Sequence, residues 1–179
     1  MSTRSVTVLG SGNTGFAVAA NLTLQGHQVT LYELPEFGSS FNAIRKTGVI
    51  NLLGVAEQGS AKIYRITTDI EEALAASDLA LLTVPAYAHK RFAKVCAPHL
   101  KAGQTVTVMP GTLGSLEWSR ILREAGSKDV TLAEVDTAPY VCRKTSPDTA
   151  TIWGIVTNLG FGVLPALETT RVGALLEPL

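Results

Sequence analysis

The sequence predicts an α/β fold, a doubly wound and mostly parallel β-sheet with helices on both of its faces. Three observations lead to this prediction. β-rich runs alternate with helical patterns along most of the chain. Residues 79–84 form a continuously apolar run, which is typical of a parallel strand buried on both faces. A glycine-rich turn at residues 10–15 joins the first β-rich run directly to the first helical pattern.

The first part of the chain has the order strand, glycine turn, helix, strand. Residues 14–25 carry an apolar-faced helical pattern, and a short helix is expected within residues 35–47 because Gly48 is a helix stop. A glycine-containing turn joins the β-rich runs at residues 49–53 and 61–67, and one of these two runs is expected to be the third strand of the sheet. The strand candidates are residues 5–9, 28–32, 49–53 and 61–67.

The alternation continues in the second part of the chain. Thr68-Asp69-Ile70-Glu71 is a capping-box pattern, so a helix is expected from there to about residue 76. Further helices are expected at residues 88–97, before Pro98, and at residues 115–125, before Gly126. The strand candidates are residues 79–84, 105–109, 130–134 and 149–155.

The last residues form an apolar helical pattern that opens at Leu164-Pro165-Ala166-Leu167. The glycine spacing at residues 10–15 is typical of a dinucleotide-binding unit, and such a unit usually supplies the cofactor site without a complete substrate pocket. We therefore expect a dinucleotide-binding domain over residues 1–160 and, over residues 161–179, a helix that leads toward a second domain. That second domain would be helical, would hold the substrate and catalytic groups, and would be absent from this chain.

The composition limits the kinds of partner that this chain is expected to bind. With 15 basic and 15 acidic residues among 179, the net charge is zero, which argues against a nucleic-acid or anionic membrane surface. Cys96 and Cys142 show neither metal-ligand nor disulfide spacing, so no metal and a cytoplasmic location are expected. The first strand begins by Ser5, which leaves no room for a signal peptide. Hydrophobic residues make up 46% and charged residues 17%, so apolar surface is expected for a partner domain or a second subunit.

The glycine turn has the spacing of the dinucleotide-binding fingerprint of Rossmann-type folds. Gly10 permits the tight strand-to-helix turn, Gly12 lets a diphosphate approach the backbone, and Gly15 lets the helix lie close to the strands. The free N–H groups at the start of the helix then face the phosphates. The expected cofactor-binding residues of the turn are Gly10, Ser11, Gly12, Asn13, Thr14 and Gly15.

Glu33 ends the second strand, eighteen residues past Gly15. At this place a carboxylate can accept hydrogen bonds from the hydroxyls of the adenosine ribose. A 2′-phosphate would instead meet a like charge. The sequence therefore predicts that NAD(H) is favoured over NADP(H).

Ligands of such a sheet lie beyond the carboxyl ends of its strands. The loop Val84-Pro85-Ala86 is expected beside the ribose and nicotinamide, and Pro110-Gly111 beside the nicotinamide. Of the three histidines, only His89 is near a loop on the ligand side of the sheet. For this residue we favour a structural position at the start of a helix over a catalytic role. Arg143 could clamp the carboxylate of a keto acid or pair with a surface acid, and the residues alone leave both open.

Several segments together resemble the amino-terminal half of the opine dehydrogenases, the octopine and nopaline group. They are the glycine turn, Val84-Pro85-Ala86 followed by His89, Pro110-Gly111, and Thr137-Ala138-Pro139-Tyr140-Val141-Cys142-Arg143. The resemblance implies an oxidoreductase that acts on CH–NH bonds. Such an enzyme condenses an L-amino acid with a 2-keto acid such as pyruvate and reduces the imine with hydride from a nicotinamide.

The resemblance also implies that Thr112, Thr137 and Cys142 line the substrate cleft. The catalytic His–Asp pair of the family lies in the second, helical domain, so no catalytic residue is expected here and the chain alone is expected to be inactive. Two other readings stay open. One is a reductase similar to ketopantoate reductase or hydroxyacyl dehydrogenase, and the other is a non-catalytic domain that senses NAD(H). Homo-oligomer formation is also left open.

Overall fold

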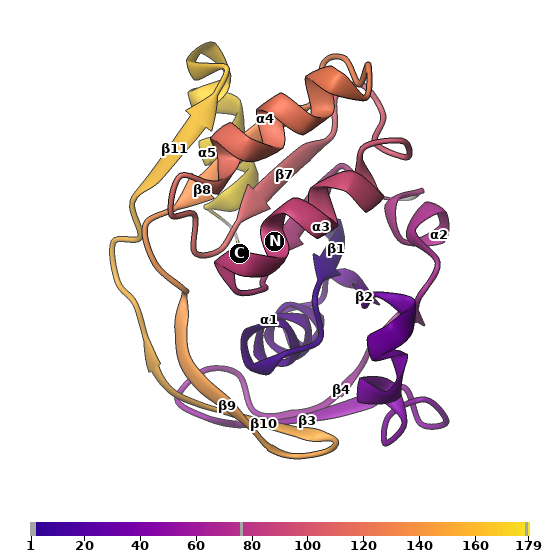
Figure 1. Ribbon diagram of the computed structural model, residues 1–179. Helices are drawn as coiled ribbons and strands as arrows, with labels where there is room; N and C mark the ends of the chain where they lie inside the picture. Colours follow the sequence, from indigo (N-terminus) through magenta and orange to yellow (C-terminus); the bar gives the residue numbers. More distant parts are fainter. Residues whose placement is uncertain (1–2, 76, 178) are drawn as a thin grey trace.

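The central sheet has seven strands in the order β11-β8-β7-β6-β1-β2-β5 (Figure 1). The computed structural model describes residues 3–75, 77–177 and 179. All neighbouring strands are parallel except β11, which runs antiparallel to β8. The expectation of a mostly parallel sheet is therefore confirmed. In chain order the strands are β1 (Ser5–Leu9), β2 (Gln28–Tyr32), β5 (Arg65–Thr67), β6 (Leu79–Leu82), β7 (Thr105–Val108), β8 (Thr131–Val135) and β11 (Phe161–Leu164).

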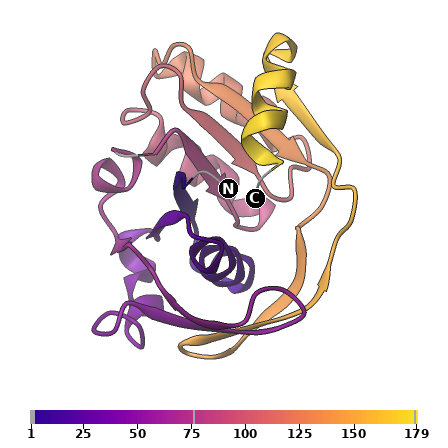
Figure 2. The same ribbon diagram turned by 180° about the vertical axis from the view of Figure 1, so that it is seen from behind.

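Helices cover both faces of this sheet, as expected (Figures 1 and 2). The short helix α2 (Ile70–Leu74), α3 (Ala86–Cys96) and α4 (Gly114–Glu124) cover one face, and α1 (Asn13–Leu24) and α5 (Thr169–Leu176) cover the other. Because side chains alternate along each strand, β1 contributes to a separate apolar cluster on each face. The expected end of α2 near residue 76 lies outside the described residues.

A second sheet, in the order β4-β3-β10-β9, covers the outer side of α1 (Figure 1). The helix is consequently enclosed between two sheets, and residues 15–22 are all buried. Of the two candidates for the third strand, the end of residues 61–67 fulfils that role as β5. The second sheet comprises β3 (Val49–Gly54), β4 (Gly59–Lys62), β9 (Tyr140–Ser146) and β10 (Thr149–Ile155).

Polar contacts fix α1 to the second sheet at both of its ends. At the start of the helix, Asn13 Oδ1 accepts a hydrogen bond from the backbone N–H of Lys144 at 2.9 Å. Near its end, Asn21 Nδ2 donates to the Tyr140 hydroxyl at 2.8 Å, and Asn21 Oδ1 accepts from the Glu57 backbone N–H at 3.3 Å. These bonds hold β9 along the helix.

The last segment differs from the helix expected over residues 161–179. It begins with the strand β11, continues through a short 3-10 turn, η2 (Ala166–Glu168), and only then forms α5. Arg171 ties α5 to the amino ends of two strands, since its guanidinium donates to the hydroxyls of Thr105 at 3.3 Å and Thr131 at 2.8 Å. The segment therefore extends the central sheet before it becomes helical.

We expect Asn21→Ala to lower the free energy of unfolding by about 1–3 kcal/mol, because it leaves the Tyr140 hydroxyl and the Glu57 N–H without their partner. This loss exceeds the helix propensity that alanine gains, at most about 0.7 kcal/mol. Urea unfolding measures it. Asn51→Ala, which removes an exposed hydrogen bond to Ser60, is the control and should change stability by less than about 0.5 kcal/mol. Equal stability of the two variants would contradict the proposed anchoring of α1.

Candidate dinucleotide-binding site

The three glycines of the turn between β1 and α1 differ in what the fold requires of them. Gly10 has φ +103°, and a Cβ there would lie 2.3 Å from Val84 Cγ1. A Cβ on Gly15 would lie 1.9 Å from the carbonyl oxygen of Gly10. Gly12, by contrast, has an ordinary φ of −72°, and no atom lies within 4 Å of the place where its Cβ would be. The space beside Gly12 is therefore open to a ligand.

The amino terminus of α1 provides an anion-binding site next to this space. Gly12 is the N-cap and makes no side-chain cap, and the first bond within the helix runs from the Phe16 N–H to the Gly12 carbonyl at 3.0 Å. The backbone N–H groups that come before Phe16 in the first turn have no acceptor within the helix. Together with the helix dipole, they favour a phosphate at this end.

Glu33 braces the glycine turn from the end of β2. Its Oε2 accepts hydrogen bonds from the backbone N–H of Ser11 at 2.8 Å and from the Ser11 hydroxyl at 2.9 Å. Its Oε1 accepts from the Leu34 N–H at 2.9 Å. A carboxylate offers about four acceptor positions, so Oε1 can still accept from a ligand hydroxyl. The carboxylate is thus held in one orientation and retains acceptor capacity.

A cavity of about 390 Å³ connects the glycine turn with the ends of β2 and β6. It brings together Gly12, Glu33, Val84 and Pro85, which the sequence analysis assigned to the cofactor. Ala86 is exposed at the start of α3 and is not among the lining residues. The cavity is lined by Gly12, Glu33, Leu34, Phe37, Thr83, Val84, Pro85, Tyr87, Ala88, Arg91 and Phe92.

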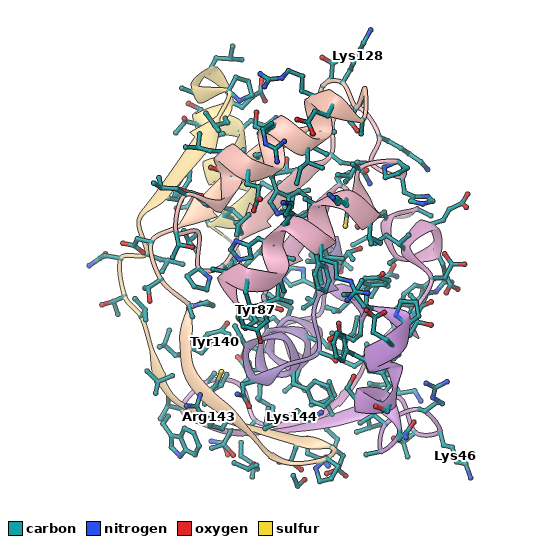
Figure 3. The ribbon with its side chains drawn as sticks, in the orientation of Figure 1. Lys46, Tyr87, Lys128, Tyr140, Arg143 and Lys144 are labelled. Carbon is teal, nitrogen blue, oxygen red and sulfur yellow. The ribbon has the colours of Figure 1, made fainter. Side chains whose placement is uncertain are left out.

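Two aromatic side chains on the wall of this cavity are largely exposed. Phe37 comes from the 3-10 turn η1 (Pro35–Phe41) and is 54% exposed, and Tyr87 comes from the first turn of α3 and is 88% exposed (Figure 3). Arg91 of α3, which also lines this cavity, forms an ion pair with Glu36 of η1. Exposed aromatic rings beside a cavity offer stacking surfaces for a flat ligand ring.

The loop after β7, which was predicted from the sequence to border the nicotinamide, lies at the carboxyl end of that strand. Pro110 follows a cis peptide bond, and Thr112 has a φ of +50°. Gly111 lies against Glu134, because a Cβ on Gly111 would be 2.5 Å from Glu134 Cβ. The Glu134 carboxylate accepts a hydrogen bond from the Ser115 N–H of α4 at 3.0 Å. Glu134 was not predicted from the sequence, although an acid near the carboxyl end of a predicted strand could have indicated it.

His89 is buried in α3 and supports the loop after β6. Its Nε2 lies 3.2 Å from the Val84 carbonyl oxygen, and Gly114 of α4 packs on its other ring nitrogen. Burial lowers the pKa of His89 below its ordinary value. With only 2% of its surface exposed, the imidazole supports the loop after β6 from inside the fold.

The segment from Thr137 to Arg143, which carries part of the family resemblance, lies partly in strand β9. Thr137 lies exposed before the strand. Cys142 is buried against α1, with Sγ 3.7 Å from the Asn13 carbonyl oxygen, and burial raises the pKa of its thiol. The thiol is therefore packed against the start of α1. Because strand residues alternate, Arg143 faces the opposite side of the sheet and is exposed. No carboxylate in the described part of the chain pairs with it.

Lys144, the next residue of β9, returns to the α1 side and approaches the glycine turn (Figure 3). Its ammonium donates to the Ser40 carbonyl at 3.3 Å and lies 3.6 Å from the centroid of the Phe16 ring. Burial lowers the pKa of Lys144, and the negative charge of Glu33 raises it. The sequence analysis missed this residue, because no local pattern shows that β9 crosses the start of α1.

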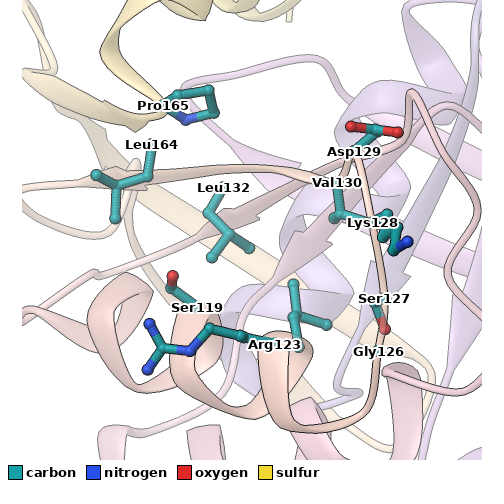
Figure 4. A pocket seen from close by; sticks show the side chains of 11 residues that line it. Ser119, Arg123, Gly126, Ser127, Lys128, Asp129, Val130, Leu132, Leu164 and Pro165 are labelled. Carbon is teal, nitrogen blue, oxygen red and sulfur yellow. The ribbon is translucent and has the colours of Figure 1, made fainter.

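A larger cavity of about 500 Å³ lies elsewhere, between α4, the amino end of β8 and β11 (Figure 4). Arg123, Lys128 and Leu164 are among its lining residues, and none of the predicted site residues is. Among the described residues no group of three His, Cys, Asp or Glu side chains could hold a metal ion. In the same part of the chain, no helix is long and apolar enough to cross a membrane.

The fold and the open glycine turn define the cofactor-binding domain of a nicotinamide-dependent dehydrogenase. Residues 5–119 match the sequence model of the NAD-dependent glycerol-3-phosphate dehydrogenase N-terminus. The chain belongs to this family of NAD-binding domains. The opine dehydrogenase of Arthrobacter sp. (strain 1C) is 34% identical over 166 residues, which are 92% of this chain and 46% of that protein. The opine dehydrogenase of Haliotis discus hannai is 26% identical over 79% of this chain and 38% of that protein.

Solved structures agree with these relatives. An octopine dehydrogenase solved with NADH and L-arginine has a TM-score of 0.80 at 20% identity, covering 94% of this chain and 46% of that chain. A yersinopine dehydrogenase with bound NADP+ has a TM-score of 0.75 at 18% identity, covering 98% of this chain and 46% of that chain. The resemblance to opine dehydrogenases is thus confirmed, and this chain is an NAD-binding domain of opine dehydrogenase type. It spans less than half the length of these relatives.

We expect Gly15→Ala to destabilise the fold by about 2–3 kcal/mol, because the added Cβ must displace the backbone of the glycine turn. Gly12→Ala should lower the free energy of unfolding by less than about 1 kcal/mol. The added Cβ enters open space, and the only loss is that alanine is a poorer N-cap residue than glycine. Thermal unfolding followed by circular dichroism compares the two variants. A Gly12→Ala variant as unstable as Gly15→Ala would show that the fold, and not a ligand, requires glycine at position 12.

Proposed function

We propose that this chain binds NAD(H) on the glycine turn and forms the cofactor half of an opine dehydrogenase-like enzyme. The observation that carries the proposal is the open space at Gly12, a glycine that neither its φ of −72° nor its packing requires. The space adjoins the amino terminus of α1, where the helix favours an anion. A dinucleotide diphosphate has the charge and the size for this place.

The neighbouring groups extend the proposal to the rest of the cofactor. The adenine ring would enter the cavity of about 390 Å³ and stack against Tyr87 or Phe37. A ribose hydroxyl would donate to the free acceptor position of Glu33. The nicotinamide would then point toward Gly111 and Thr112, at the carboxyl end of β7.

Glu33 supports a preference for NAD(H) over NADP(H). Its carboxylate cannot easily turn away from a 2′-phosphate, because three hydrogen bonds from Ser11 and Leu34 hold it. Two negative charges about 4 Å apart near a protein surface repel each other by about 4 kcal/mol before salt screening. The 2′-hydroxyl of NAD(H) is free of this repulsion.

The relatives suggest the substrates of the complete enzyme. Octopine dehydrogenase structures have been solved with NADH and L-arginine and with NADH and pyruvate. By analogy, the amino nitrogen of an L-amino acid would add to the keto carbon of a 2-keto acid and release water. NADH would then transfer hydride to the carbon of the resulting imine, whose nitrogen would take up a proton. Thr112 and Thr137 would border the substrate on this domain.

The division of labour between two domains is part of the proposal. Residues 1–160 would form the dinucleotide-binding domain, and residues 161–179 would lead toward a helical domain that holds the acid–base groups. This division is supported by His89, which is buried in α3 and offers no exposed acid–base group. We also propose a cytoplasmic location, on the ground that both cysteines are free thiols.

Isothermal titration with NADH tests the proposed site. We expect wild-type protein to bind NADH, and Gly12→Ala to weaken binding at least tenfold while the fold stays intact, because the methyl group occupies the place of the diphosphate. Gly162→Ala is a matched control, since its Cβ also enters open space but lies on β11. Well-folded wild-type protein that binds no nicotinamide cofactor would refute the proposal.

Glu33→Gln tests the cofactor preference. The amide removes the negative charge and keeps an oxygen that can accept from Ser11, so the ratio of NADPH affinity to NADH affinity should rise about tenfold or more. Parallel titrations with the two cofactors give this ratio. An unchanged ratio, with normal NADH binding in both proteins, would mean that the carboxylate does not face the 2′ position.

A further inference from the structure

Lys144 brings a positive charge from the second sheet to the corner of the site where Glu33 lies. Its ammonium donates to the Ser40 carbonyl at 3.3 Å, and the Ser40 hydroxyl is 2.6 Å from the Ser11 hydroxyl. Ser11 in turn donates to Glu33 through both its N–H and its hydroxyl. An ammonium, two hydroxyls and a carboxylate therefore form one connected cluster beside the glycine turn.

The position of this ammonium is fixed by its surroundings. The backbone of Lys144 is anchored to the start of α1 by Asn13, and the side chain crosses the ring of Phe16, a cation–π contact of 3.6 Å to the centroid. Within the described residues, no carboxylate lies within 4 Å of it as an ion-pair partner. The charge is thus held in place but not neutralised by a close partner.

We propose that Lys144 determines cofactor selectivity by offsetting Glu33 at the 2′ position of the adenosine ribose. The proposal rests on the proposed function, because it assumes that the ribose lies against Glu33. With NAD(H), the 2′-hydroxyl donates to the carboxylate and needs no cation. With NADP(H), the 2′-phosphate is repelled by Glu33 but attracted by the Lys144 ammonium. The Ser40 hydroxyl can donate to it, whereas the single proton of the Ser11 hydroxyl is donated to Glu33.

The direction of the side chain distinguishes the 2′ position from the diphosphate. Lys144 is tied to Ser40, a residue of η1, which directly follows β2 and Glu33. The adenosine half of a dinucleotide lies on the β2 side of the glycine turn, whereas the diphosphate crosses the start of α1. The site is consequently expected to tolerate NADP(H) better than Glu33 alone would permit.

Titrations with two matched pairs of ligands test this role. NADPH differs from NADH, and adenosine 2′,5′-bisphosphate from AMP, only by the 2′-phosphate. We expect Lys144→Met, which keeps much of the apolar stem, to weaken NADPH and the bisphosphate about tenfold or more and to change NADH and AMP less than twofold. Lys144→Arg should retain NADPH binding. Lys128→Met, a lysine at the far side of the molecule, is the control and should change neither pair (Figure 3).

The possible outcomes separate this proposal from the proposed function. Equal weakening of AMP and the bisphosphate would overturn the proposal, because the ammonium would then act on the 5′-phosphate or through the position of β9. Unchanged affinities, or wild-type protein that binds NADH but no measurable NADPH, would also overturn it. Wild-type protein that binds none of the ligands would refute the dinucleotide site itself. Thermal unfolding of Lys144→Met verifies that the variant is folded.

Discussion

The close approach of α1 to the glycine turn is the constraint on which the site depends. Gly15 lies so near the Gly10 carbonyl that a side chain carbon would come within 1.9 Å of it. This contact directs the amino terminus of the helix to the edge where β1, β2 and β6 end. Glu33 reinforces the same arrangement from β2, because its carboxylate binds the backbone of Ser11. Packing and hydrogen bonding thus fix the amino terminus of α1, where we propose that the diphosphate binds.

The second sheet gives α1 a function beyond that of a surface helix. A helix covered on only one side would show a polar outer face, whereas residues 15–22 of α1 are all buried. The covering strand β9 also carries Cys142 and Lys144 across the start of the helix. The start of α1 is therefore contacted by a part of the chain more than a hundred residues away from the glycine turn. The stability of the helix and the charge at its end depend on the same strand.

The sequence was sufficient where the relevant spacing is local. The glycine turn, Glu33 and the apolar strand at Leu79–Leu82 were predicted because each depends on neighbouring residues. The second sheet was not predicted, since β3 and β10 pair Asn51 with Thr149 across a long separation. For the same reason β9 was not among the predicted strands, and the alternation that separates Cys142 from Arg143 was missed. Lys144 and Glu134 join the site region only through such distant pairing.

A crystal structure of the chain soaked with NADH tests the central claim most directly. The account predicts that the diphosphate lies in the open space at Gly12, within hydrogen-bond distance of the first amides of α1, about 3 Å. It also predicts that a hydroxyl of the adenosine ribose donates to Glu33. A diphosphate bound away from the start of α1, or a Glu33 carboxylate turned away from the ribose, would contradict it.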